Sequence, residues 1–170
     1  MARPAETDFP AYFAGYISKV NTETISEAIN KYSVALNQFY TSLPEAKADH
    51  AYAPGKWTIK EVLQHLIDAE RVFSYRLMCI ARKEKTSLPS FDENAYAEFS
   101  QADKRSLSDL KEEFTAVRKS TDLLLNSLSD EQFDEVGTSN NSKVTAKAIA
   151  YVVFGHLLHH KEILEERYLG

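Results

Sequence analysis

Hydrophobic residues recur every three or four positions along most of this chain, which is the pattern of amphipathic helices. Four long segments carry the pattern, running from about 22 to 43, 58 to 84, 106 to 128 and 145 to 168. Five glycines and five prolines in 170 residues, with few alternating runs of β-branched residues, favour helix over strand. The pattern therefore predicts an all-α chain that forms a four-helix bundle with long connecting loops.

Residues at the ends of these segments support the same division. Thr58 and Glu61 have the spacing of a capping box at the start of the second segment, and Thr145 is placed to cap the fourth. Pro44 ends the first. Shorter helices are expected over 10–17, 94–99 and 129–132, and loops over 86–94 and 137–142.

Composition narrows the classes of function. We expect one domain over residues 1–170, because this length suffices for one hydrophobic core. A net charge of −5 argues against nucleic acid as a partner. No apolar run approaches the ~20 residues of a membrane span, and the N-terminus lacks a secretory signal. The single cysteine, Cys79, cannot form an internal disulfide and has the spacing of a packing residue, so we expect a cytoplasmic protein.

Two histidines stand out in the last segment. His156 and His160 lie four residues apart, and both fall at the centre of its apolar stripe. That stripe is formed by Ile149, Val152, Val153, Leu157, Ile163 and Leu164. An unpartnered polar group in such a position is costly, and this spacing brings two imidazoles within about 6 Å. Because neutral imidazole is the commonest metal-binding side chain, the pair indicates either a metal site or two satisfied core histidines.

A metal site in a bundle needs a donor from a second helix. His50 lies in a predicted loop and His159 lies about a quarter-turn off the stripe, so His65 in the second segment is the natural third donor, although it sits on that helix's flank. Glu70 falls inside the stripe of the same segment. Its carboxylate is a metal ligand, an acceptor for a histidine N–H, or half of a buried ion pair for which Arg76 is a candidate partner.

Several sharper motifs are absent from the sequence. There is no His-Glu-x-x-His, no Glu-x-x-His, no Cys-x-x-Cys, no glycine-rich phosphate loop and no Gly-x-Ser-x-Gly. These absences exclude the zincin and di-iron carboxylate patterns.

Two stretches resemble a known family. Pro54-Gly-Lys-Trp-Thr-Ile-Lys-Glu-Val-Leu-Gln-His-Leu-Ile-Asp-Ala-Glu-Arg71 is similar to the central motif of the DinB-like family, and Gly155-His-Leu-Leu-His-His160 to its C-terminal histidine motif. Segments 73–76 and 88–92 also resemble the family. The resemblance implies a bundle of up-down-down-up order and one divalent metal ion, commonly zinc or nickel. It implies that His65, His156 and His160 hold this ion.

The family's activities are less uniform than its fold, and fold does not settle function. Some relatives look like thiol S-transferases that use low-molecular-weight thiols such as bacillithiol or mycothiol. Others resemble hydrolases or isomerases, and many have no known activity. Our first hypothesis is metal-assisted transfer of a low-molecular-weight thiol onto an electrophilic small molecule, with Glu70 beside a ligand histidine and Asp92 at the entrance. The alternatives are a hydrolase that uses a metal-activated water, and a non-catalytic metal-binding module that forms a homodimer.

Overall fold

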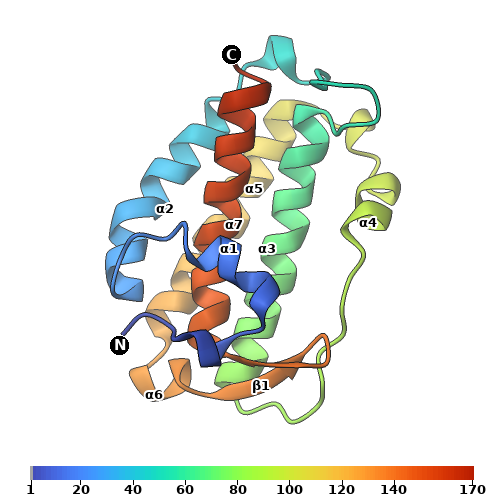
Figure 1. Ribbon diagram of the computed structural model, residues 1–170. Helices are drawn as coiled ribbons and strands as arrows, with labels where there is room; N and C mark the ends of the chain where they lie inside the picture. The colour runs from blue at the N-terminus through green and yellow to red at the C-terminus, as the bar shows by residue number, and fades with distance from the viewer. Residues whose placement is uncertain (1) are drawn as a thin grey trace.

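Four long helices build the molecule (Figure 1). The computed structural model describes residues 2–170. The long helices are α2 (Ile25–Thr41), α3 (Ile59–Ala81), α5 (Leu107–Ser127) and α7 (Ala146–Arg167). Each lies within a few residues of a segment expected from the hydrophobic pattern, which confirms the predicted four-helix bundle.

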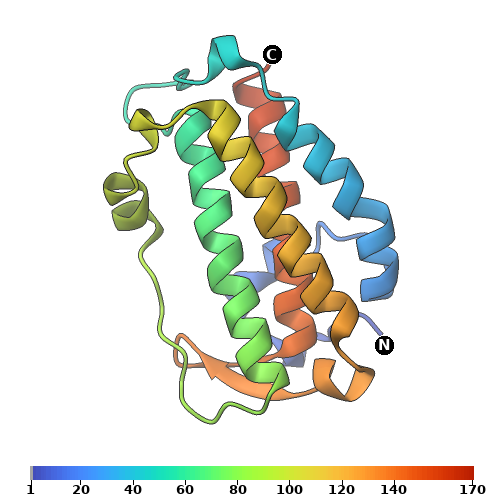
Figure 2. The ribbon, with the colours of Figure 1, turned by 180° about the vertical axis from the view of Figure 1, so that it is seen from behind.

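The order of the helices is up-down-down-up. In Figures 1 and 2, α2 and α7 run from bottom to top, whereas α3 and α5 both run from top to bottom. α3 packs against α5 and α7, and α2 packs against the same two helices, so α2 and α3 occupy opposite corners of the bundle. Because α3 and α5 are parallel, the segment between them must return along the full height of the bundle (Figure 2). This return explains the long connection that the sequence contains there.

Side-chain caps fix where the long helices begin. Thr24 accepts a hydrogen bond from the backbone N–H of Glu27, and Thr58 accepts one from that of Glu61, each in a capping box. The side chains of Ser106 and Thr145 cap α5 and α7 by accepting hydrogen bonds from the backbone N–H groups of Asp109 and Ala148. The first long helix starts three residues later than position 22 because Thr24 is the cap.

α7 is the central helix of the bundle. Every residue from Ala148 to Leu157 is buried, so the helix is covered on all sides rather than along one stripe. The additional cover is α1 (Ala14–Ile17), which packs across α7 in front of the bundle (Figure 1). Gly155 allows this approach, because a Cβ atom at that position would lie 2.1 Å from the backbone oxygen of Tyr16.

Shorter elements complete the chain. The expected short helices are present, with a 3-10 turn leading into α1. The remaining elements are η1 (Glu6–Asp8), η2 (Ala11–Phe13), η3 (Glu45–Lys47), α4 (Glu93–Phe99), η4 (Ala102–Lys104), α6 (Asp130–Phe133), β1 (Val136–Ser139) and β2 (Ser142–Thr145). None of the helices formed by residues 2–170 combines the length and apolar character that a membrane crossing requires.

The prediction of a plain loop over 137–142 is wrong. β1 and β2 pair as an antiparallel hairpin across Asn140 and Asn141, whose φ angles are 49° and 57°. A two-residue turn in which both φ angles are positive matches the right-handed twist of the two strands that it joins, and asparagine tolerates this conformation. Leu88 also exchanges backbone hydrogen bonds with residues 138 and 140, so the hairpin holds the returning segment against the bundle.

Candidate metal centre

Three buried histidines converge between α3 and α7. His65 comes from the second turn of α3, and His156 and His160 come from successive turns of α7. One nitrogen of each ring lies within 4.8 Å of the others, and the Nε2 atoms of His65 and His156 are 3.1 Å apart. The side chains are 8%, 5% and 9% exposed, respectively. The flank position of His65 thus faces inward, and the structure brings together all three predicted donors.

The chemistry of these donors fits a divalent metal ion. Burial lowers the pKa of His65 to about 4 and that of His160 to about 3, and it lowers the pKa of His156 well below its usual value. The rings are therefore neutral at pH 7, and neutral imidazole is the form that binds metal. Within residues 2–170, the hydrogen bonds of these rings link His65 only to His156. Three imidazoles that form no hydrogen bond to an oxygen among the described residues could hold a metal ion.

Aromatic side chains set the orientation of the imidazoles. The ring centroid of Trp57 lies 4.8 Å from that of His65, and the centroids of Phe73 and Tyr16 lie 5.5 Å and 5.4 Å from that of His156. The contacts from Phe73 and Tyr16 are edge-to-face. Packing from three separate segments limits rotation of the rings and keeps their nitrogens close together.

A cavity of about 320 Å³ opens onto all three histidines. Its wall is mainly aromatic, with contributions from α1, α3 and the segment that returns toward α5. Its polar lining outside the cluster includes Arg76, Glu93, Asn140 and His159. A space of this size, lined by both aromatic and polar side chains, is typical of a small-molecule site.

The structure places Glu70 away from the histidines. Its carboxylate oxygen Oε1 accepts a hydrogen bond from Nη1 of Arg118 at 2.6 Å, and both side chains are nearly inaccessible. Arg118 also binds Asp122, one turn further along α5. Burial raises the pKa of Glu70, and the positive charge of Arg118 opposes this rise. Glu70 is therefore half of a buried ion pair, which is one of the three roles considered for it. Its partner is Arg118, so the candidate partner Arg76 was wrong.

Asp92 and His159 do not lie where the sequence led us to expect them. Asp92 does not line the cavity with the histidines, and its carboxylate instead caps α4 by accepting from the N–H groups of Asn94 and Ala95. His159 does line the cavity, and its ring packs edge-to-face against Tyr16. His159 was not expected in the site because it lies off the apolar stripe of α7, and nothing in the hydrophobic pattern showed that α1 would cover that side.

Comparisons with known proteins agree with this architecture. The chain superposes on YfiT from Bacillus subtilis, described as a candidate metal-dependent hydrolase with an unusual four-helix bundle topology. The TM-score is 0.71 with 19% sequence identity, covering 96% of this chain and 89% of that one. A relative from Oceanobacillus iheyensis, named as a candidate metal-dependent hydrolase, is 28% identical over 82 residues. That match covers 46% of this chain and 47% of the relative, so the chain matches about half of that protein's length.

A protein-family sequence model also matches this chain. It describes the DinB superfamily and aligns with residues 34–164, a range that includes α3, α5 and all three clustered histidines. The match spans well over half of the chain. This protein therefore belongs to the DinB superfamily.

Proposed function

We propose that this protein is a metal-dependent enzyme acting on a small molecule, with one divalent ion held by His65, His156 and His160. Zinc and nickel, the two ions that the family resemblance implies, both suit imidazole donors. The observation that carries the proposal is that one cavity reaches all three histidines. A closed structural zinc site is surrounded by four protein ligands, whereas a catalytic site keeps a position open to solvent or substrate.

The ion would supply Lewis acidity, which lowers the pKa of a water or thiol in its open position. The protein's own groups prepare the site for this chemistry. The imidazoles are kept neutral by burial, so they offer lone pairs rather than protons. Trp57, Phe73 and Tyr16 pack against the rings and also line the cavity.

Hydrolysis is the reaction that we propose first. Both relatives described above carry hydrolase names, and the neutral donor set leaves the full charge of a divalent ion available to an anionic nucleophile. The same donor set favours a thiolate. Transfer of a low-molecular-weight thiol such as bacillithiol or mycothiol to an electrophile is therefore the second candidate.

Metal content tests the ligand set. Protein purified without added metal and then dialysed should retain about one divalent ion per chain, measured by mass spectrometry of the metals. His160→Ala should lose stoichiometric metal. His159→Ala is the matched control, because it removes the neighbouring imidazole, which lines the cavity but lies outside the cluster, and it should retain the ion. Unchanged metal content in His160→Ala would exclude this ligand set.

Cobalt substitution tests whether the site is open. A small thiol added to the cobalt protein should change its visible absorption, because the cavity gives the thiol access to the ion. A non-catalytic module with a closed site would show no change while chelation lowered its melting temperature. Ester and amide hydrolysis, compared with thiol consumption in the presence of an electrophile, then separates the two candidate reactions.

A further inference from the structure

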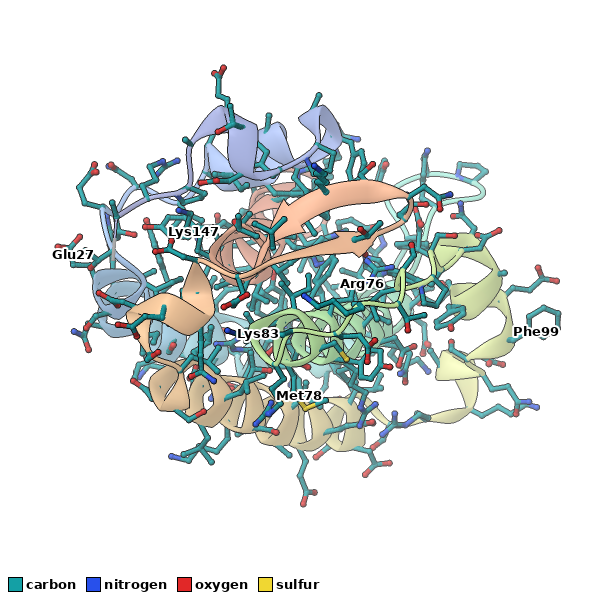
Figure 3. All side chains as sticks on the ribbon, turned by 90° about the horizontal axis from the view of Figure 1, so that it is seen from below. Glu27, Arg76, Met78, Lys83, Phe99 and Lys147 are labelled. Carbon is teal, nitrogen blue, oxygen red and sulfur yellow. The ribbon has the colours of Figure 1, made fainter. Side chains whose placement is uncertain are left out.

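Arg76 is a buried cation that lines the same cavity as the three histidines. It lies on α3 eleven residues after His65, which is about three helical turns, so both side chains share one face of the helix. Its side chain is only 5% exposed, yet no carboxylate of residues 2–170 lies within ion-pair distance. In Figure 3, the labelled Arg76 lies inside the outline of the molecule near α3 and the hairpin, whereas Glu27 and Phe99 lie at the rim.

The other buried arginine shows how this chain compensates such a charge. Arg118 is 2% exposed and donates hydrogen bonds to two carboxylates, those of Glu70 and Asp122. A buried charge without a counter-ion is costly, so structural arginines are usually paired in this way. Arg76 lacks that compensation, although it is buried to a similar degree.

The contacts that Arg76 does make fix its position without neutralising it. Its Nη2 donates a hydrogen bond of 2.6 Å to the backbone oxygen of Pro89, and the guanidinium lies 5.6 Å from the ring centroid of Phe91. No described hydrogen bond involves its Nε or Nη1 within residues 2–170. The guanidinium is therefore held at the cavity wall with donors still available.

Among the charged groups that face the cavity, Arg76 is the main candidate for binding an anion. It is the only lysine or arginine among the described residues that line this cavity. Glu93 also lines the cavity, but it forms no described ion pair with Arg76.

We propose that Arg76 binds the anionic group of the substrate, a carboxylate or a phosphate, and so orients the rest of the molecule toward the histidines. The planar guanidinium fits both kinds of oxyanion. The Cα atoms of His65 and Arg76 are roughly 16 Å apart along α3, and the long arginine side chain shortens this span. The substrate is thus a small anion whose reacting group lies at the end away from its charge, with an apolar or aromatic body that fits the aromatic wall. This inference rests on the proposed function only in taking the cavity as the substrate site.

Trp57 allows a direct binding test, because it is the only tryptophan of the chain and lines the cavity. The probes are phenylacetate, phenyl phosphate and the neutral phenylacetamide, titrated into the full-length protein at pH 7.5 while tryptophan fluorescence is followed. At least one anion should bind about tenfold more tightly than the amide, which is the effect of one good charged hydrogen bond. Which anion binds better separates carboxylate from phosphate. Equal binding of all three probes would overturn the proposal.

Variants assign the preference to one residue. Arg76→Met should reduce the ratio between anion and amide to about one, and Arg76→Lys, which retains the charge, should keep part of it. A purely structural arginine would alter stability but leave this ratio unchanged. Arg71→Met is the matched control: Arg71 lies on the same helix and lines an adjacent hollow that Arg76 also borders, but it does not line the main cavity. Loss of the preference in Arg71→Met would place the anion in that outer hollow and overturn the proposal.

Metal removal separates this inference from the proposed function. The preference for the anion should persist after chelation, because it depends on Arg76 and not on an ion at the histidines. A preference seen only in the metal-loaded protein and retained in Arg76→Met would assign the anion to the metal, which contradicts the inference. Loss of catalysis on chelation with the preference intact would support both.

Discussion

Gly155 is the position where one added methyl group should disturb both the fold and the site. It lies in the interior of α7, directly before His156, and the backbone of α1 crosses it. A Cβ atom there would be 2.1 Å from the carbonyl oxygen of Tyr16 and 2.5 Å from its carbonyl carbon. These are backbone atoms, so the clash cannot be relieved by rotating a side chain. Gly155→Ala therefore requires α1 to move away from α7.

Two opposing effects determine how much Gly155→Ala changes the free energy of unfolding. Alanine is favoured over glycine inside a helix by about 1 kcal/mol. Overpacking against a fixed neighbour costs about 1–3 kcal/mol, and a clash this close falls at the upper end of that range. We expect a net loss of about 2 kcal/mol in the free energy of unfolding. For a domain of this size, this corresponds to a fall of about 4–8 °C in melting temperature.

Gly15 is the matched control for this substitution. It lies in α1 itself, and a Cβ atom there meets nothing within 4 Å. Gly15→Ala should therefore leave stability unchanged or raise it by up to about 1 kcal/mol. Urea unfolding of both variants with chelator present measures the difference without a contribution from bound metal. If Gly155→Ala proved as stable as Gly15→Ala, the close approach of α1 to α7 would be refuted.

Three further predictions follow from buried polar groups. Arg118→Met should lower the free energy of unfolding by about 3–5 kcal/mol, because it leaves the buried Glu70 charged and without its partner. In urea unfolding, the double variant Arg118→Met with Glu70→Leu should recover most of this loss. An equal loss in the single and double variants would argue against the ion pair. Tyr40→Phe removes a buried hydroxyl that donates a 2.6 Å hydrogen bond to the backbone oxygen of Leu157, and calorimetry should show a loss of about 1 kcal/mol; an unchanged melting temperature would contradict that hydrogen bond. Chelated protein should lose stability as the pH falls from 6.5 to 5. Histidines are protonated over this range in the unfolded state, whereas the buried histidines of the folded state stay neutral, because burial lowers the pKa of His65, for example, to about 4. Each buried histidine contributes about 1–2 kcal/mol to this loss, and a flat pH profile in denaturant titrations would mean that the folded protein accepts those protons.

Local sequence determined the helices and their ends. Hydrophobic spacing and side-chain caps act within a few residues, so the four long helices and the caps at Thr58 and Thr145 could be predicted without knowledge of the fold. The spacing of His156 and His160 is equally local, and it places both rings on one side of any helix. The two-asparagine turn of the hairpin is also a local signal, but the scarcity of alternating residues around it concealed the strands.

Tertiary packing decided what those local features do. The third imidazole, His65, lies on a different helix, and spacing alone left its direction open, so only the packing of α3 against α7 brings it to the pair. The partner of Glu70 is Arg118, forty-eight residues away on α5, whereas the nearer Arg76 turns to the cavity. A sequence pattern shows which side chains share a face of a helix, but which groups lie across from that face depends on how separate helices pack together.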